Sequence, residues 1–370
     1  MDDYTIDEII EGFNEHPEMQ RLQGVGVNER HASIGACIDW SLKLLPREAQ
    51  ELFPKLSVFA GGFFANDVQE VCETKEAAKH LGIMKRYSLL QRNDSESLHQ
   101  SRFKMLETAQ KYAAEKLGDA DQLKRRHAAH FLDTLNKASE QLSKNEQAEG
   151  FARIDADYEN ILAGVERSRE LKDHGALVQY SSRLAGYLSH RRRFAQRFLL
   201  AEQAAQAAEA SGDPKLVAGT QNNLGIAYAD LPSGDRGANL ARAIECYEAA
   251  LRVRTERDFP LDWAMTQNNL GAAYAELPRG DRGANLARAI ECYEAALRVR
   301  TERDFPREWA DTEYNLAIAY TSLTNGNREQ NLKLAIACFE AAARGYTSIG
   351  IADEATEALE RAASLKKQLG

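Results

Sequence analysis

One stretch of the chain, GDRGANLARAIECYEAALRVRTERDFP, occurs twice among its 370 residues, at Gly234–Pro260 and again at Gly280–Pro306. Aligning the C-terminal half on the 46-residue spacing of these copies gives three units, which begin near Val217, Trp263 and Trp309. Self-similarity at a fixed period of this size is typical of arrays of stacked supersecondary units. The sequence therefore predicts a solenoid in its C-terminal half, in which each unit contacts its neighbours.

Each unit carries two helical patterns joined by a loop. In the second pattern, apolar residues recur at the spacing of one helical stripe, namely Ala243, Ile244, Tyr247, Ala250 and Leu251. The loops read SGDRG, RGDRG and NGNRE, and their glycines interrupt the helices. A helix pair of this size cannot bury its own stripe, so we expect identical units to stack and bury it against one another.

The predicted core of the repeats consists of leucine and aromatic side chains that keep their positions from unit to unit. These are Leu224, Tyr228, Tyr247, Leu270, Tyr274, Tyr293, Tyr320 and Phe339. Three cysteines, Cys246, Cys292 and Cys338, also recur with the period, and no Cys-x-x-Cys or Cys/His ligand spacing accompanies them. We interpret them as small buried residues and expect no metal.

These positions resemble the tetratricopeptide repeat. Leu270, Gly271 and Tyr274 match the L-G-x2-Y of its first helix, and Ala289, Tyr293 and Ala296 match the A-x3-[FY]-x2-A of its second. The resemblance implies a mainly α-helical fold that ends in an α-α superhelix, whose first helices line a concave groove. Residues 213–350 would form three 46-residue repeats. An irregular first repeat would occupy 174–212, and a capping helix would occupy 351–370.

A ladder of asparagines provides the main functional signal. Asn223, Asn269 and Asn315 occupy one position in three successive first helices, and Asn222 and Asn268 lie beside two of them. By resemblance, an asparagine at this position can bind the backbone of an extended peptide, because an amide offers both a donor and an acceptor. The alternative is that these amides only tie adjacent helices together.

The predicted ligand groove joins this ladder to other residues of the first helices. Besides the five asparagines, it includes Met265, Glu276, Asp230, Ile226, Ala272, Ala275, Ile318 and Thr321. Its chemistry is mixed and mildly acidic, which favours a protein or peptide ligand without a special preference for a C-terminal carboxylate.

A second ladder consists of Arg236, Arg282 and Arg328 in the inter-helix loops. Each arginine follows an aspartate or asparagine, so a pair that stabilises the loop is the plainer interpretation. An exposed edge of arginines that meets an acidic partner is the alternative.

The N-terminal half has a different pattern. A helix at 31–45 is followed by a second helix that starts at Pro46 and ends in a short apolar strand near Phe59. Short helices at 65–72 and 75–81 come next, and strands at 87–93 and 101–106 flank a polar turn as a β-hairpin. Helices followed by a two-stranded wing predict a winged-helix domain over 28–117.

The segments IDWSLKLLPREAQELFPKLSVFAGGF and RFKMLETAQKYAAEKL resemble the winged-helix module of STAND-type signal-transduction ATPases of the NB-ARC class. In that family the module lies between a nucleotide-binding domain and a repeat sensor. The resemblance implies a helical linker at 118–173 and a remnant of the ATPase helical subdomain at 1–27.

Two departures from the family concern nucleotide chemistry. The sequence has no G-x4-G-K-[ST] phosphate loop, and the position of the family's sensing histidine is Leu106, within Met105-Leu106-Glu107. We therefore expect no enzymatic activity and no cofactor, with an ATPase domain as a possible partner in a longer native chain.

The favoured function is a non-enzymatic sensor and regulatory arm of a STAND-like signalling protein, which binds a protein or peptide in the groove. One alternative is a DNA-binding transcriptional regulator acting through the winged helix, with Arg92, Arg102 and Lys104 on its wing. The net charge of −9 and the acidic segment 65–72, taken as the third helix, argue against nucleic acid. The other alternative is a fragment of an ATP-dependent signalling switch.

Two further expectations follow from composition and pattern. No apolar run is long enough to span a bilayer and the first residues are acidic, which favours a cytoplasmic protein without a membrane segment. His127 and His130 are three residues apart without an acidic third ligand, so we interpret them as part of a solvated helix face.

Overall fold

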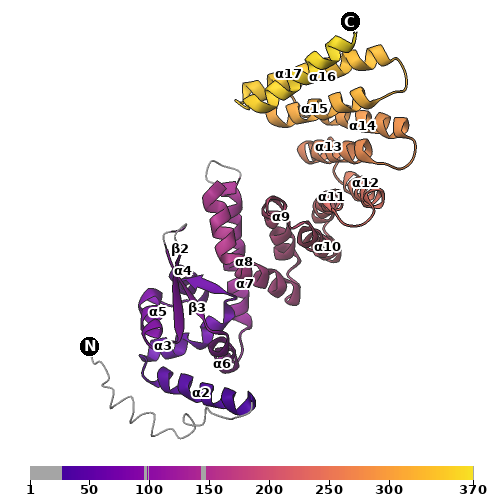
Figure 1. The fold of residues 1–370 in the computed structure, drawn as a ribbon. Helices are drawn as coiled ribbons and strands as arrows, with labels where there is room; N and C mark the ends of the chain where they lie inside the picture. Colours follow the sequence, from indigo (N-terminus) through magenta and orange to yellow (C-terminus); the bar gives the residue numbers. More distant parts are fainter. Residues whose placement is uncertain (1–26, 96–97, 99, 143–146, 370) are drawn as a thin grey trace. The chain divides into compact units, whose positions relative to one another are not determined.

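The structure, a computed structural model, describes residues 27–95, 98, 100–142 and 147–369. The predicted remnant at 1–27 therefore lies outside the described residues, apart from Val27. The chain divides into two compact units, Met1–Ala176 and Leu177–Gly370 (Figure 1). Both are mainly helical, and the helices of the second unit pack in consecutive pairs, as predicted.

The first unit combines helices with a small antiparallel sheet. Its helices are α2 (Val27–Lys43), α3 (Arg47–Leu52), the 3-10 helix η2 (Pro54–Val58), α4 (Ala65–Cys72), α5 (Ala77–Arg86), α6 (Glu107–Leu117), α7 (Asp121–Leu142) and α8 (Gln147–Glu170). Its strands are β1 (Gly62–Phe64), β2 (Leu90–Ser95) and β3 (Gln100–Met105), in the order β1-β3-β2. The predicted hairpin is present as β2 and β3, whose register pairs Leu90 with Met105.

Two details of this unit differ from the sequence-based expectation. The segment that ends near Phe59 is the 3-10 helix η2, and the short strand follows it at Gly62–Phe64. The helix directly before the hairpin is α5, which extends to Arg86, beyond the end of the helix predicted at 75–81. The prediction had taken the acidic α4, which comes before α5, as the third helix of the winged helix. The difference matters for charge, because α5 carries Lys79, Lys85 and Arg86.

Aromatic packing and one buried asparagine hold β1 against the long helices. The ring centroids of Phe59 and Phe63 are 4.8 Å apart, and those of Phe59 and Phe131 are 6.2 Å apart. Asn160 of α8 is fully buried, accepts a hydrogen bond from the backbone N–H of Ala60 at 2.8 Å and donates one to the carbonyl of Gly62 at 2.7 Å. One amide thus bonds to two backbone groups on either side of Gly61 and ties them to α8.

The expectation of a solvated histidine face is wrong for His127. This side chain is fully buried, and its Nε2 lies 3.2 Å from Oδ1 of Asn160. Burial, followed by the charge of Arg167, holds the pKa of His127 well below its usual value. The apolar stripe of α7 faces the core on this side, and the hydrogen bond to Asn160 makes the burial tolerable.

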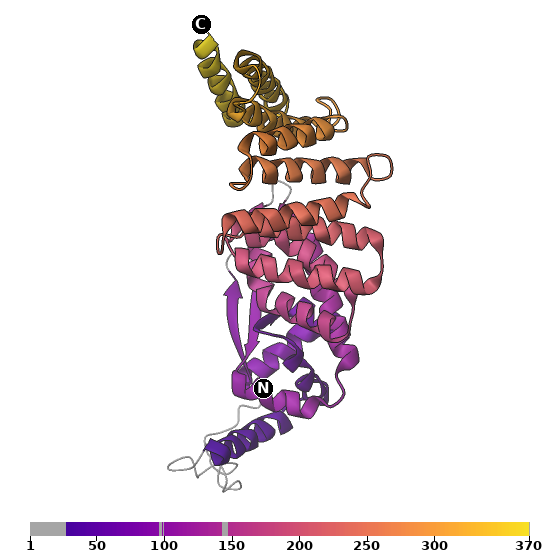
Figure 2. The same cartoon turned by 90° about the vertical axis from the view of Figure 1, so that its right-hand side faces the viewer.

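The second unit is a succession of helices. These are α9 (His174–His190), α10 (Phe194–Ser211), α11 (Pro214–Asp230), α12 (Arg236–Leu251), α13 (Pro260–Glu276), α14 (Arg282–Leu297), α15 (Pro306–Ser322), α16 (Arg328–Ser348) and α17 (Ala352–Leu369). The three repeats are the pairs α11–α12, α13–α14 and α15–α16, and each helix packs on the next (Figure 2). Proline begins each first helix, where its missing N–H costs no intrahelical bond.

A glycine–aromatic contact brings the two helices of a repeat together. A Cβ added at Gly225 would meet the Tyr247 ring at 2.6 Å, and one added at Gly271 would meet the Tyr293 ring at 2.9 Å. In the third repeat the glycine is replaced by Ala317 and the tyrosine by Phe339. The absence of a side chain on the first helix lets the aromatic ring of the second helix lie directly on its backbone.

The predicted core residues fall into two groups. Leu224, Leu270, Tyr247, Tyr293 and Phe339 are buried, as expected.

The second group, Tyr228, Tyr274 and Tyr320, is only half-buried. The hydroxyl of Tyr274 donates to Glu248 at 3.1 Å, and that of Tyr320 donates to Glu294 at 2.7 Å. A phenol needs a polar partner, so these rings lie at the edge of the interface with their hydroxyl groups toward solvent.

The connector RTERDFP has a structural role that explains why it is repeated without change. Thr255 and Asp258 bond to each other within the turn, with the Thr255 hydroxyl 2.8 Å from the Asp258 carboxylate. Arg254 donates to the hydroxyl of Thr266, which is fully buried in the next helix, at 3.0 Å. Arg300 makes the same bond to Thr312 at 2.9 Å in the following repeat. All five cysteines are free thiols.

We predict that Gly271→Ala lowers the free energy of unfolding by about 1–3 kcal/mol, because its Cβ overlaps the Tyr293 ring. Gly186→Ala is the matched control, since Gly186 lies within helix α9 and an added Cβ meets nothing within 4 Å. That change should stabilise the chain by roughly 0.5–1 kcal/mol through helix propensity. Urea denaturation followed by circular dichroism measures both, and equal effects would contradict the contact.

Candidate functional site

The candidate site is a hollow between the first and second repeats. Side chains of α11, α12 and α13 enclose about 170 Å³, and the adjacent first helices contact one another directly. Five residues of the predicted groove line it: Ile226, Asp230, Asn269, Ala272 and Glu276. Residues from different repeats, far apart in sequence, therefore meet at one place, together with Arg236, Leu240 and Tyr247 of the second helix.

Ion pairs neutralise the acidic residues of this hollow. Glu276 pairs with Arg236, and Asp230 pairs with Arg197 of α10. Each carboxylate has its own cation, so the predicted groove carries no unpaired negative charge from Asp230 or Glu276 at this hollow.

The next interface differs by one residue. The position of Glu276 is taken by Ser322 in the third repeat, so the arginine that corresponds to Arg236 there, Arg282, lacks the acidic partner. Among the described residues Arg282 bonds only to the carbonyl oxygen of Ala275, and it is exposed. Its remaining N–H groups can donate to a ligand.

The asparagine ladder connects adjacent first helices. Asn269 Nδ2 donates to Asn222 Oδ1 at 3.2 Å, and Asn315 Nδ2 lies 3.5 Å from Asn268 Oδ1. Asn222 is fully buried, so it cannot meet a ligand.

The other ladder asparagines, Asn223, Asn268, Asn269 and Asn315, are half-buried, as is Met265. Each amide has more donors and acceptors than these contacts use. The ladder therefore ties the repeats together and keeps polar capacity on the first-helix face.

The arginine ladder has a different role from the one expected. Arg236, Arg282 and Arg328 reach back to carbonyl oxygens at the C-terminal end of the first helix of their own repeat, namely those of Ala229, Ala275 and Thr321. The preceding Asp235, Asp281 and Asn327 instead accept a hydrogen bond from the backbone at the start of the second helix. The predicted arginine–aspartate pairs within the loop do not form, because both groups satisfy helix ends.

A further ladder was missed by the sequence reasoning. The side chains of Asn239, Asn285 and Asn331 donate to two carbonyl oxygens of their own loop, for example Asn285 Nδ2 to Arg279 O at 2.7 Å. Their 46-residue spacing was the available signal. These bonds fix the inter-helix loop and leave the groove to other residues.

The capping helix contributes to a second hollow. Ile318 and Thr321 of α15 meet Arg361, Ser364 and Leu365 of α17 around about 260 Å³. The cap thus takes the place of a further first helix at the end of the array.

A buried polar cluster lies in the first unit, where no site was predicted. The carboxylate of Asp67, on α4, lies 3.0 Å from His130 Nε2 and 3.0 Å from an Nη of Arg153. Asp157 of α8 is fully buried and lies 2.6 Å from Arg153 Nε, off the axis of a hydrogen bond. Two carboxylates thus share one guanidinium.

The pKa values of the two carboxyl groups in this cluster are shifted in opposite directions. Burial, reinforced by the charge of Asp67, raises the pKa of Asp157 to about 7. Burial also opposes ionisation of Asp67, but the hydrogen bond from His130 and the charge of Arg153 outweigh it and lower its pKa. The arginine compensates one charge better than two.

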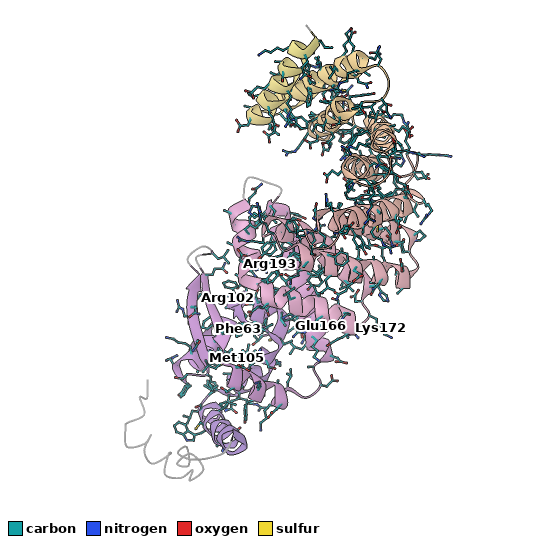
Figure 3. All side chains as sticks on the ribbon, turned by 45° about the vertical axis from the view of Figure 1, so that its right-hand side comes forward. Phe63, Arg102, Met105, Glu166, Lys172 and Arg193 are labelled. Carbon is teal, nitrogen blue, oxygen red and sulfur yellow. The ribbon has the colours of Figure 1, made fainter. Side chains whose placement is uncertain are left out.

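The predicted wing cations do not form one group. Arg102 lies on β3, near Phe63 of β1, and donates to the carbonyl oxygens of Gly62 and Ala156 (Figure 3). It therefore has a structural role inside the unit. Arg92 and Lys104 are exposed, and so is the side chain of Leu106, at 43%.

The described residues offer neither a metal site nor a membrane-spanning helix. They contain no group of three or more His, Cys, Asp or Glu side chains that could hold a metal ion. In the same part of the chain, no helix has the length and apolarity that crossing a membrane requires.

Comparison with known proteins gives partial matches. No protein-family model matches the chain. Three mycobacterial proteins, from Mycobacterium bovis and two strains of Mycobacterium tuberculosis, are each 30% identical over 152 residues. The match covers 39% of this chain and 17% of theirs, and each is named, provisionally, as an HTH-type transcriptional regulator. The chain thus spans about a sixth of the length of these curated relatives.

Two solved structures were found to be similar to parts of it. A STAND protein with a tetratricopeptide repeat sensor, from Pyrococcus horikoshii, is 12% identical with a TM-score of 0.39, over 98% of this chain and 69% of its own. BtubC from P. vanneervenii is 19% identical with a TM-score of 0.33, over 66% of this chain and 92% of its own. Both TM-scores are low, so neither superposition identifies a shared arrangement of the whole chain.

We predict that Asn222→Ala lowers the free energy of unfolding by about 1–2 kcal/mol, because it removes the acceptor of the Asn269 amide at a buried position. Asn223→Ala is the control, since the side chain of Asn223 is half-buried and the hydrogen bond that it accepts from Asn222 is long, at 3.4 Å. Thermal and urea unfolding measure both variants. A double-mutant cycle of Asn222 and Asn269 with no coupling would contradict the bond.

A second prediction concerns pH. The folded pKa of Asp157 lies above its unfolded value, so the folded state binds the extra proton, and this stabilisation is lost as the pH rises from about 4 to 7. Each unit of pKa difference corresponds to about 1.4 kcal/mol, so the loss should be on the order of 2–4 kcal/mol. Asp157→Asn should flatten this slope.

The measurement is the free energy of unfolding at several pH values, for the natural chain and Asp157→Asn. The other charges that act on Asp157, those of Asp67, Arg153, Arg102 and His130, are common to both proteins. Because the carboxyl groups of Asp157 and Asp67 interact, the difference between the two profiles reports Asp157 together with its effect on Asp67. Identical pH profiles would show that Asp157 ionises without cost.

Proposed function

We propose that the chain is the non-enzymatic sensor and regulatory arm of a STAND-like signalling protein, and that its repeats bind a protein or peptide segment. The observation that carries this proposal is the hollow between the first two repeats, where Ile226, Asn269, Ala272 and two paired carboxylates meet. Half-buried amides beside small apolar side chains suit an extended peptide, which presents backbone donors and acceptors together with side chains.

The second interface adds a preference to this proposal. Arg282 keeps unused donors beside Ser322, whereas the corresponding arginine of the first interface is occupied by Glu276. A ligand with an acidic side chain at this point gains a charge-assisted hydrogen bond. Among the described residues, Arg282 and Arg328 of the predicted arginine edge make no ion pair, and Arg236 is already paired.

The same proposal extends to the first unit and to the whole protein. We interpret the helices and hairpin of residues 28–117 as a winged helix, in keeping with the STAND resemblance. In this proposal the unit couples the sensor to an ATPase domain in a longer, cytoplasmic protein.

A second candidate is DNA binding through the first unit. It is favoured by the position of α5 directly before the hairpin, where Lys79, Lys85 and Arg86 offer cations that the acidic α4, taken as the third helix in the sequence analysis, does not. Exposed cations on a helix that precedes a wing are what contact with duplex phosphates requires. The overall charge of −9 opposes such contacts at long range.

The groove is tested by filling it. A random peptide library displayed on phage is selected on the immobilised chain, and the affinity of the selected peptide is measured for two variants. Ala272→Arg places a long charged side chain in the hollow and should weaken binding by at least about tenfold, or about 1.4 kcal/mol.

Ala287→Arg is the control, because Ala287 is exposed on α14 and does not line the hollow. Its affinity should match that of the natural chain, and circular dichroism shows whether both variants are folded. Failure to select any peptide, or equal affinities for both variants, would refute the proposal.

A further inference from the structure

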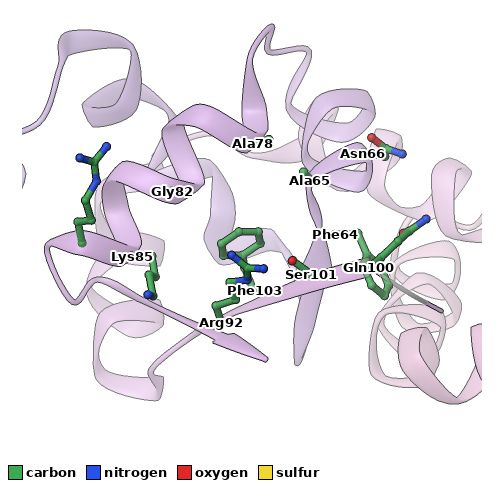
Figure 4. Close-up of a pocket in the computed structure, with 11 residues that line it drawn as sticks. Phe64, Ala65, Asn66, Ala78, Gly82, Lys85, Arg92, Gln100, Ser101 and Phe103 are labelled. Carbon is green, nitrogen blue, oxygen red and sulfur yellow. The ribbon is translucent and has the colours of Figure 1, made fainter. Parts of the chain in front are cut away.

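A hollow of the first unit lies between α5 and the β2–β3 hairpin. Its volume is about 590 Å³, within the range of sites for small organic ligands. In Figure 4, Ala78 and Gly82 lie along α5 on one side, and Arg92, Ser101 and Phe103 lie on the strands on the other. Its lining residues come from β1, α4, α5, β2 and β3, so the hollow is part of the folded unit.

The composition of the walls is one-sided in charge. Lys85 and Arg86 of α5 and Arg92 of β2 lie at the rim, and no acidic residue lines the hollow. Lys85 and Arg86 make no ion pair with any other described residue, although 56 acidic residues occur in the chain. Three cations around one cavity attract an anion.

The floor is apolar, with polar groups at a few points. Phe64 and Phe103 are buried at 2% and 7% exposure, and they present ring surface to the hollow. Asn66, Gln100 and Ser101 supply amide and hydroxyl groups. An apolar surface with a few polar groups and a charged rim suits a ligand that has both an apolar body and an anionic group.

Gly82 is a second, independent observation. It lies within α5, where glycine costs about 0.5–1 kcal/mol relative to alanine. Neither backbone nor packing requires it, because its φ is not positive and an added Cβ would meet nothing within 4 Å. This differs from Gly271, whose missing side chain makes room for Tyr293. The bare backbone at Gly82 lines the open hollow.

A purely structural role for the cations explains only part of the hollow. Lys85 and Arg86 lie in the last turn of α5, where positive charge interacts favourably with the helix dipole. That effect does not account for Arg92 on a strand, for the apolar floor, or for the glycine. A ligand with an anionic group at the rim and an apolar body over the floor would contact the three cations, the two phenylalanine rings and the glycine.

We propose that this hollow binds a small organic phosphate, with the phosphate among Lys85, Arg86 and Arg92 and the apolar body over Phe64 and Phe103 beside Gly82. Such a ligand is small enough to enter the hollow, whereas a nucleic-acid duplex is too wide and can only place its phosphates at the rim. The concave shape and apolar floor favour the small ligand. The site is independent of the repeat groove.

The probe is 1-naphthyl phosphate, followed by its fluorescence anisotropy with the full chain. It should bind saturably, with a dissociation constant of about 1 mM or below, given about 0.3 kcal/mol for each of its non-hydrogen atoms. Inorganic phosphate and 1-naphthol, which each have one half of the chemistry, should bind at least about tenfold more weakly.

Two kinds of variant test the location. Gly82→Leu fills the hollow from a residue with open space around it, improves helix propensity, and should abolish binding without loss of stability. The double variant Lys85→Gln/Arg86→Gln should weaken binding at least about tenfold. Lys79→Gln is the control, since Lys79 lies on the same helix but outside the hollow, and its affinity should be unchanged.

Three results would overturn the proposal. The first is no saturable binding of the probe up to about 10 mM, which is beyond the affinity expected for its size. The second is binding that survives Gly82→Leu in a folded protein. The third is tight, salt-dependent binding of duplex DNA that depends on the same cations and is not displaced by the probe. That result would assign this surface to nucleic acid.

Discussion

The interface between neighbouring repeats is the constraint on which the second unit depends. A pair of short helices exposes an apolar stripe that it cannot cover alone, so each repeat is stable only against the next. The same requirement acts on the polar residues of the repeats. Asn222 is buried because the next repeat covers it, and its carbonyl oxygen is satisfied because that repeat supplies the amide of Asn269. Apolar burial and polar pairing are thus achieved by the same stacking.

This constraint also separates structural residues from residues available to a ligand. Arg236, Arg282 and Arg328 all satisfy the carbonyl end of a first helix, but only Arg236 is also paired with a carboxylate of the next repeat. The difference arises from one position, Glu276 against Ser322, in otherwise similar surroundings. Near-identical repeats can therefore present different chemistry along one groove.

The first unit differs in that its buried polar residues include carboxylates, Asp67 and Asp157. Asn160 satisfies backbone atoms beside β1, and Arg153 is shared by two buried carboxylates. Buried polar networks of this kind specify one packing arrangement when they are satisfied. The hollow between α5 and the hairpin lies outside this network. Its cations remain at the surface, which is why it is suited to binding.

The sequence by itself determined the repeat period, the helix pairs, the capping loops and the hairpin. Each of these depends on local signals, since helical periodicity, glycine and proline act within a few residues of the backbone. The resemblance to tetratricopeptide repeats also predicted that certain first-helix residues would face one groove. The residues Ile226, Asp230, Asn269, Ala272 and Glu276 do line one hollow.

Only the tertiary structure decided which partners these side chains choose. His127 can be buried because its ring nitrogen bonds to the side chain of Asn160. Asn160 in turn bonds to the carbonyl of Gly62, 98 positions away in the sequence. The half-buried tyrosines, the arginines that cap helix ends and the cationic hollow likewise depend on neighbours from distant segments. A hydrogen bond or ion pair is decided by distances of about 3 Å, which helical periodicity does not encode.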